Sequence, residues 1–138
     1  MKVLVSACLI GENCKYDGKN NYSEKLMEFL KDKEYVAVCP EMLGGLKAPR
    51  IPCEIVNGVV MNKAGENVDK EFRLGAAKAL DIAKREQIDL AVLQQRSPTC
   101  GAGIIYDGTF SGNKIPGNGV FAQLLIDNGF EVIREDQL

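Results

Sequence analysis

Short apolar runs alternate with amphipathic segments along most of the chain. Valine-rich or otherwise apolar runs bounded by turn residues predict buried strands at residues 2–7, 35–39, 88–93 and 130–133. Apolar residues at helical spacing predict a helix capped by Asn21 with Glu24, a long helix from Asp69 to about Glu86, and a last helix over 120–127. Strands and helices therefore alternate in sequence.

This alternation predicts βαβ units and a mainly parallel sheet. The expected fold is α/β, a single-domain three-layer Rossmann-like structure over residues 1–138, with about four strands plus small hairpins. Asn57-Gly58 within residues 55–61 predicts one hairpin, and Asp107-Gly108 between 104–106 and 109–110 predicts another. Residues 41–54 are expected to be irregular, and the acidic tail is expected to be exposed.

The composition narrows the classes of function. The chain has 138 residues, a net charge of -2 and no histidine. The missing histidine excludes Ser-His and Cys-His catalysis and histidine-ligated metals. The charge gives no reason to expect duplex nucleic acid or an anionic membrane as a partner, and no segment is apolar enough to span a bilayer. Only seven residues precede Cys8, too few for a secretory leader, so we expect a cytoplasmic location.

Three of the five cysteines fall where predicted strands end. Cys8 follows the first strand, Cys39 ends the second, and Cys100 lies in the loop that leaves the third. Ligands in open α/β sheets bind beyond the carboxyl ends of the strands. We therefore expect these three thiols to meet at one edge of the sheet and to form a shared metal site.

Three soft ligands without histidine suit an iron–sulfur cluster or zinc. A [4Fe-4S] cluster held by three thiolates would leave one iron open. Cys14 and Cys53 are expected to be incidental, with a fourth ligand or a resolving thiol as the alternatives. The chain has no C-x-x-C pair, which argues against a zinc ribbon or a thioredoxin-like site.

The chain resembles the thiouracil desulfidase family, long catalogued as a domain of unknown function. The resemblance extends from Val5 to about Phe130. The motifs that carry it are Ser6-Ala7-Cys8-Leu9-Ile10-Gly11, Lys15-Tyr16-Asp17-Gly18, Cys39-Pro40-Glu41, Gly44-Gly45-Leu46, Pro49-Arg50 and Ser97-Pro98-Thr99-Cys100-Gly101. Thr99 stands where a serine is common, and residues 94–96 stand where a lysine often precedes the Ser-Pro motif.

The resemblance implies a [4Fe-4S] cluster bound by Cys8, Cys39 and Cys100. It also implies that the open iron takes sulfur from a small thiolated molecule such as 2-thiouracil, without net redox change. Glu41 and Ser97 match the positions that lie beside the cluster in the family. The alternatives are a zinc, cluster or sulfide carrier without turnover, and a metal-free thiol enzyme.

The residue types support roles for the same side chains. Glu41, two residues after Cys39, is expected to take a proton from water, and the Ser97 hydroxyl to donate to substrate or relay a proton. Arg50, Tyr16 and Asp17 are candidate substrate contacts. The sequence leaves open whether the protein is a monomer or a homodimer.

Overall fold

The central sheet has four parallel strands in the order β2-β1-β5-β8. The computed structural model describes all residues, 1–138. The strands are β1 (Lys2–Ser6), β2 (Glu34–Val38), β5 (Leu90–Leu93) and β8 (Val132–Arg134). Each predicted strand is therefore present, shortened or shifted by one or two residues. The predicted parallel sheet of four strands is confirmed.

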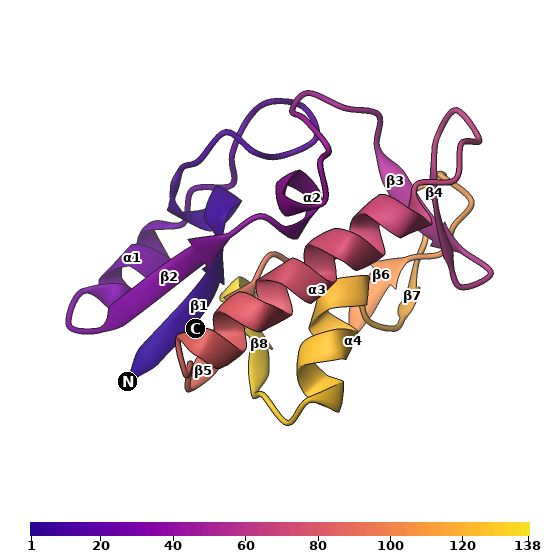
Figure 1. The fold of residues 1–138 in the computed structure, drawn as a ribbon. Coiled ribbons are helices and arrows are strands. Elements are labelled where there is room, and N and C mark those ends of the chain that lie inside the picture. Colours follow the sequence, from indigo (N-terminus) through magenta and orange to yellow (C-terminus); the bar gives the residue numbers. More distant parts are fainter.

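Helices cover both faces of this sheet (Figure 1). They are α1 (Glu24–Leu30), α3 (Asp69–Arg85) and α4 (Val120–Asp127). Side chains alternate along β1, so Val3 and Val5 pack with α1 on one face while Leu4 packs with α3 and α4 on the other. The three-layer arrangement expected from the sequence is confirmed.

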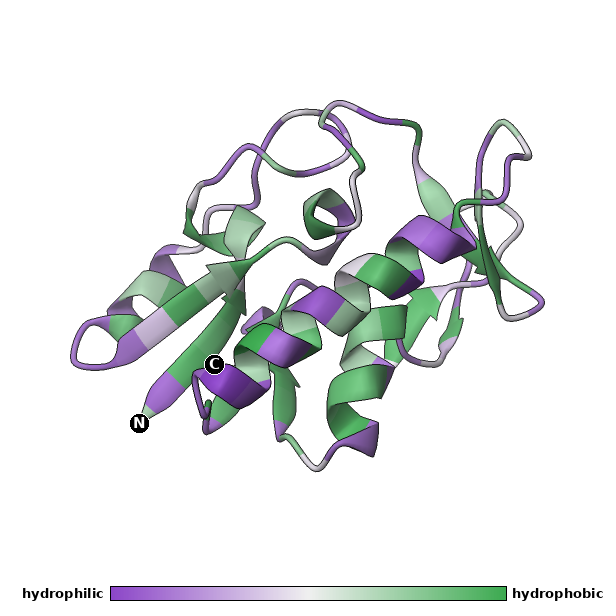
Figure 2. Ribbon diagram, viewed as in Figure 1, coloured by the Kyte–Doolittle hydropathy of each residue, from purple (hydrophilic) through white to green (hydrophobic).

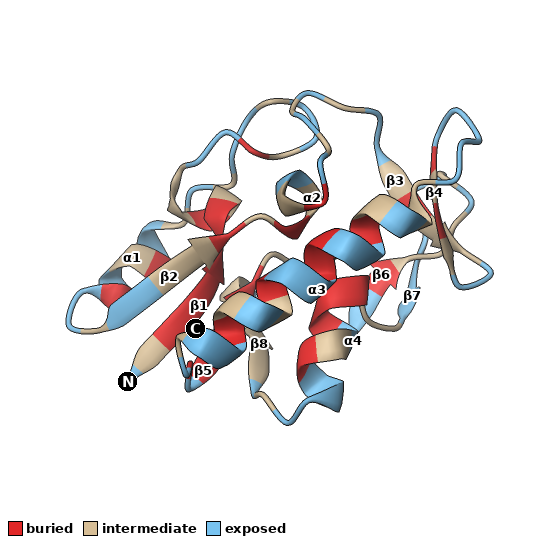
Figure 3. Cartoon of the chain, in the orientation of Figure 1, coloured by how far each residue is buried: buried red, intermediate tan, exposed pale blue.

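Buried positions follow the helix and strand periods that the sequence predicts. Strand β5 is buried along its whole length, as expected for a central parallel strand (Figure 3). Helix α3 buries Phe72, Gly75, Ala76, Ala79 and Ala83 on one stripe, while its other face is polar (Figure 2). The small residues on the buried stripe of α3 allow close packing.

A short helix and two hairpins complete the fold. They are α2 (Pro40–Leu43), the pair β3 (Cys53–Val56) and β4 (Val59–Asn62), and the pair β6 (Ile104–Tyr106) and β7 (Lys114–Pro116). The Asn57-Gly58 turn is confirmed, with φ of 51° and 79° as a type I′ turn requires. Glu54 connects the two hairpins by accepting the backbone N–H groups of Gly108 and Phe110.

The second predicted hairpin was placed wrongly. The partner of β6 is β7, not residues 109–110, and the intervening loop begins at Asp107. The Asp107 carboxylate accepts the Thr109 N–H, and the N–H groups of Gly108 and Phe110, on either side of Thr109, bond to Glu54. These backbone donors are therefore satisfied outside a hairpin ladder, and the chain continues as a loop.

Three smaller expectations also need correction. Ser23, not Asn21, caps α1, because the Ser23 hydroxyl accepts the Leu26 N–H. Cys39 was expected to end the second strand but lies one residue beyond β2, as the N-cap of α2. Helix α2 itself occupies the start of residues 41–54, which were expected to be irregular. The acidic tail is not fully exposed, since Glu135 is half-buried and accepts the Gln95 N–H.

Two glycines let α2 lie directly on α3. A Cβ atom built on Gly75 would overlap the carbonyl oxygen of Pro40, and one on Gly44 would overlap the carbonyl oxygen of Glu71. Only residues without side chains fit at both positions. This contact fixes the short helix that carries Glu41 and follows Cys39.

The two central strands meet at the point where the connections change faces. Helix α1 follows β1 on one face, and α4 follows β5 on the other. Ligands in open α/β sheets bind in the crevice at this switch point, beyond the carboxyl ends of the strands. Ser6 ends β1 here, and Gln94 directly follows β5.

Candidate metal centre and catalytic site

One cavity of about 490 Å³ opens at the carboxyl ends of β1, β2 and β5. Most of its lining residues lie at the ends of β1, β2 and β5 or in the segments that follow them, and the wall is completed by Lys63, Tyr106, Phe110 and Gly112. All five cysteines contribute to the lining, namely Cys8, Cys14, Cys39, Cys53 and Cys100. The predicted gathering of Cys8, Cys39 and Cys100 at one edge of the sheet is therefore what the structure contains.

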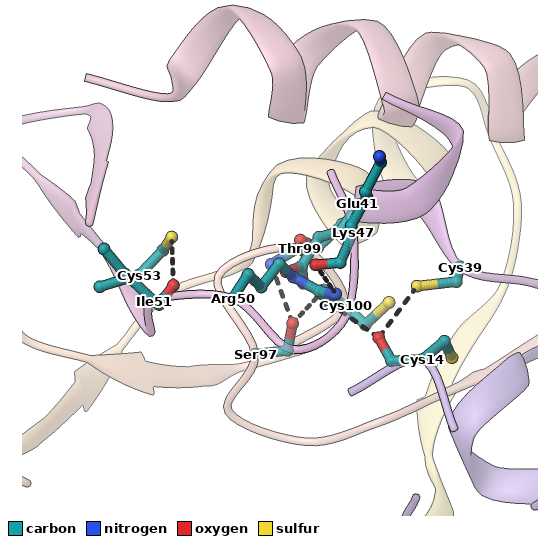
Figure 4. Close-up of polar contacts among 10 residues, drawn as sticks. All are labelled: Cys14, Cys39, Glu41, Lys47, Arg50, Ile51, Cys53, Ser97, Thr99 and Cys100. Atoms are coloured by element: carbon teal, nitrogen blue, oxygen red, sulfur yellow. Dashed lines mark hydrogen bonds and ion pairs between the residues drawn. The ribbon is translucent and has the colours of Figure 1, made fainter. Parts of the chain in front are cut away.

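Local backbone structure presents two of the three predicted ligands, Cys8 and Cys39. Cys8 lies in a 3-10 turn, Ala7–Ile10, directly after β1, and its sulfur accepts a hydrogen bond from the Asn21 amide at 3.7 Å. Cys39 begins α2, where Pro40 supports the first helical turn. Its thiol donates to the Cys14 carbonyl oxygen at 3.7 Å (Figure 4).

The thiols ionise very differently. Burial raises the pKa of Cys8 to about 11 and raises the pKa of Cys100 well above its ordinary value. The hydrogen bond from the Cys14 thiol, helped by the Met42 N–H and the Arg50 charge, lowers the pKa of Cys39 to about 7. The same hydrogen bond raises the pKa of Cys14. Cys39 is therefore the first of these thiols to become a thiolate.

The donor set fits an iron–sulfur cluster better than a single metal ion. No group of three or more Cys, Asp or Glu side chains is placed around one ion position. A cluster takes one thiolate per iron, so its ligands stand further apart than those of tetrahedral zinc. Cys8, Cys39 and Cys100 line one cavity, and Cys8 and Cys39 lie near enough to Cys100 for their charges to raise its pKa, so three soft ligands face a shared space.

Glu41 is held at the cavity by two side chains (Figure 4). Its Oε1 accepts a hydrogen bond from the Arg50 Nε at 2.9 Å, and its Oε2 accepts one from the Thr99 hydroxyl at 2.9 Å. The Glu41 and Arg50 side chains are only 16% and 11% exposed. A carboxylate bound in this way through both oxygens keeps one orientation.

The Arg50 guanidinium makes hydrogen bonds to three acceptor groups of the protein. Besides Glu41, its guanidinium donates to the Cys14 carbonyl oxygen at 2.9 Å and to the Lys47 carbonyl oxygen at 3.2 Å. Each of its three nitrogen atoms therefore has a protein acceptor. The Cys14 carbonyl oxygen is shared by Arg50 and by the Cys39 thiol.

Ser97 supports the loop that carries Cys100. Its Oγ accepts the backbone N–H of Thr99 at 3.0 Å and that of Cys100 at 3.1 Å. A hydroxyl has two acceptor lone pairs and one donor hydrogen. With both lone pairs in use, the Ser97 hydroxyl can only donate to a third group.

Comparison with known proteins identifies the family of this chain. A family model described as 2-thiouracil desulfurase matches residues 3–137. The chain belongs to the 2-thiouracil desulfurase family. It is 42% identical to the uncharacterized protein YbbK of Bacillus subtilis (strain 168), over 99% of this chain and 97% of that protein. It is also similar to the solved structure of [4Fe-4S]-dependent thiouracil desulfidase TudS (DUF523), with a TM-score of 0.93, 40% identity, and coverage of 99% of this chain and 92% of that one.

The two remaining predicted substrate contacts, Tyr16 and Asp17, differ in position in this chain of the desulfurase family. Tyr16 lines the cavity, and its ring is partly exposed. Asp17 does not line the cavity. Its carboxylate accepts the Lys19 N–H at 3.0 Å and lies 3.7 Å from the Lys15 ammonium. Asp17 thus stabilises its own loop, whereas Tyr16 faces the site.

Sequence reasoning missed the polar partners of the named residues. Thr99 is fully buried, and its bond to Glu41 joins two segments 58 residues apart. Gln94 lines the cavity with its amide oxygen buried and without a donor. An unpaired buried polar atom of this kind costs about 1–3 kcal/mol. Two signals in the sequence pointed to Gln94: its position directly after a predicted strand, and its place in residues 94–96, where a lysine often precedes the Ser-Pro motif.

No helix of the chain combines the length and apolar character needed to cross a membrane.

Proposed function

We propose that this chain is a [4Fe-4S]-dependent desulfidase that hydrolyses a thiocarbonyl group in a small molecule such as 2-thiouracil. The observation that carries the proposal is the presence of Cys8, Cys39 and Cys100 in one cavity with Glu41 and Ser97. Membership of the 2-thiouracil desulfurase family and the likeness to TudS support the choice of cofactor and substrate.

The proposed reaction exchanges sulfur for oxygen. Water adds to the thiocarbonyl carbon, the C–S bond breaks, and uracil and hydrogen sulfide leave with no net change in oxidation state. Cys8, Cys39 and Cys100 would hold the cluster through their thiolates. When bound, the cluster supplies an open iron position, a Lewis acid suited to sulfur. The protein must then supply a base, a proton donor and a substrate orientation.

Glu41 is the proposed base. Its carboxylate is fixed by Arg50 and Thr99, yet each oxygen retains a free lone pair. A fixed carboxylate at the cavity can accept a proton from the attacking water without first reorganising. No histidine is available to do this, because the chain has none.

Ser97 is the proposed hydrogen-bond donor. Because both of its lone pairs are taken by backbone N–H groups, its hydrogen is free to point at a substrate oxygen or at developing negative charge. In this proposal Glu41 accepts a proton from water, and Ser97 donates a hydrogen bond to the substrate.

Tyr16 and Arg50 are the proposed substrate contacts. The partly exposed ring of Tyr16 offers a face on which a planar heterocycle can stack. Arg50 adds a fixed positive charge beside Glu41, and two of its N–H groups remain free after its three hydrogen bonds. Asp17 contributes by holding the loop that carries Tyr16.

The test is turnover by anaerobically prepared protein. We expect a broad brown absorbance, about four iron and four sulfide per chain, and conversion of 2-thiouracil to uracil with stoichiometric sulfide release. Cluster-free protein should give no uracil. Protein that holds the cluster but releases no sulfide would instead be a cluster or sulfide carrier, and the proposal would be wrong.

A further inference from the structure

Gln94 stands where the fold directs a ligand. It directly follows β5, and its backbone N–H donates to the Ser6 hydroxyl at 2.9 Å, across the junction between the two central strands. The connections change faces at this junction, which is the usual ligand position in open α/β sheets. Gln94 and Ser6 both line the cavity that contains the cysteines.

The side-chain amide of Gln94 has no partner in the protein. Its Oε1 is buried without a hydrogen-bond donor, and only the backbone N–H of this residue makes a hydrogen bond. Native proteins rarely leave such atoms unpaired unless another molecule pairs with them. The polar side chains around it differ, because Glu41, Arg50 and Ser97 all bond to protein groups.

We propose that the Gln94 side-chain amide determines substrate specificity by pairing with the amide edge of the heterocycle, a ring N–H and its adjacent carbonyl oxygen. This inference rests on the proposed function and adds the recognition element to it. A turn of the Gln94 side chain brings its buried oxygen into the cavity. There the oxygen accepts the ring N–H, and the side-chain nitrogen donates to the exocyclic oxygen. In 2-thiouracil the matching edge is N3–H with O4.

The chemistry favours an amide at this position over a charged side chain. Glutamine presents one acceptor and one donor side by side in a plane, the complement of N3–H and O4. The thiocarbonyl carbon is the other neighbour of N3, so pairing this edge fixes the direction of the C=S bond. A substrate held through both atoms is oriented for attack, and an analogue without the N–H leaves the glutamine oxygen unpaired.

The experiment compares two glutamines that both line the cavity. Gln94→Met removes the amide and keeps the side-chain length, and Gln95→Met makes the same change one residue away. Each variant and the wild-type holoenzyme are assayed with 2-thiouracil, 1-methyl-2-thiouracil and 3-methyl-2-thiouracil. Calorimetry measures the binding of uracil and 3-methyluracil to the same proteins, independently of turnover.

We expect the wild type to reject the 3-methyl compounds by about 10- to 100-fold and to accept the 1-methyl compound. Gln94→Met should raise KM for 2-thiouracil by a similar factor, change kcat less, and abolish discrimination against the 3-methyl group. Gln95→Met should retain the discrimination against the 3-methyl group. Wild-type discrimination retained in Gln94→Met overturns the inference.

Because binding and turnover are measured separately, failure of the recognition role of Gln94 can be distinguished from failure of the desulfidase proposal. If the protein releases no sulfide but binds uracil more tightly than 3-methyluracil through Gln94, the desulfidase proposal fails and the recognition role stands. If sulfide is released with equal rates from 2-thiouracil and its 3-methyl derivative, the recognition role alone fails. If neither base binds, the recognition role is wrong.

Discussion

Gly75 of α3 lies so close to Pro40 of α2 that a single added methyl group would overlap the Pro40 carbonyl oxygen. Gly44 makes the reciprocal approach toward the backbone of Glu71. This contact supports the short helix α2, which follows Cys39 and carries Glu41. The position of the candidate base is therefore set in part by a contact between α2 and α3.

Substitution Gly75→Ala should destabilise the fold. Helix propensity alone favours alanine by about 0.5–1 kcal/mol. Overlap with backbone that cannot move aside costs more, about 1–3 kcal/mol. We expect a lower melting temperature and a lower iron content per chain. The exposed Ala77→Gly variant, on the same helix, should lose about 1 kcal/mol by propensity with normal iron content. A Gly75→Ala protein more stable than wild type would contradict the packing argument.

The five cysteines should divide into two groups when replaced. Cys8→Ala, Cys39→Ala and Cys100→Ala should each lose the cluster, because each removes one of the three proposed thiolate ligands. Cys14→Ala and Cys53→Ala should retain it. Iron and acid-labile sulfide, measured in anaerobically purified protein, check the assignment. Full cluster content in any of the first three variants would rule that residue out as a ligand.

The variant Glu41→Gln should retain the cluster and lose turnover. The amide keeps the shape of the carboxylate but cannot accept a proton, so kcat should fall at least about 100-fold. The absorbance spectrum and iron content report on the cluster, and sulfide release reports on turnover. Normal turnover in this variant would assign the base role to another group.

Thr99 should affect catalysis through its hydroxyl rather than through its volume. Thr99→Val fills the same buried space but removes the donor to Glu41, so kcat should fall about 5- to 30-fold. Thr99→Ser keeps the donor and should stay near wild type. The kinetic comparison is decisive because both variants should bind iron normally. Equal loss in the two would indicate a packing role.

In cluster-free protein, Cys39 should be the thiol that reacts first. The hydrogen bond from Cys14 lowers the pKa of Cys39 to about 7, so its thiolate forms as pH rises through about 6 to 8. Burial raises the pKa of Cys8 to about 11, so Cys8 stays protonated over that range. Mass spectrometry after brief iodoacetamide treatment at several pH values measures both rates. A Cys39 rate that does not rise until pH 9 would refute the low pKa.

The sequence predicted the sheet and the cysteine positions because both depend on local pattern. Apolar runs separated by helical periodicity are enough to predict parallel strands, and the ends of such strands lie together by geometry. Cys39 was misplaced by one residue only, since Pro40 marks both a strand end and a helix start.

The hydrogen-bond donors to Glu41 could not be predicted from the sequence, for a physical reason. Arg50 and Thr99 reach Glu41 from different loops, and Thr99 is 58 residues away. Loop paths of this kind depend on tertiary contacts, as the loop after Asp107 also demonstrates. There the buried carboxylate of Glu54 takes N–H groups that local propensity assigns to a hairpin.

The Cys14 carbonyl oxygen has a consequence for the assembly of the centre. It receives the Cys39 thiol and the guanidinium that also holds Glu41. A Cys39 thiolate has no proton to give, so ionisation or ligation leaves Arg50 as the sole side-chain donor to that carbonyl. The proposed ligand Cys39 and the proposed base Glu41 therefore share one arginine, so a change in the Cys39 thiol alters the hydrogen bonding of the group that holds Glu41.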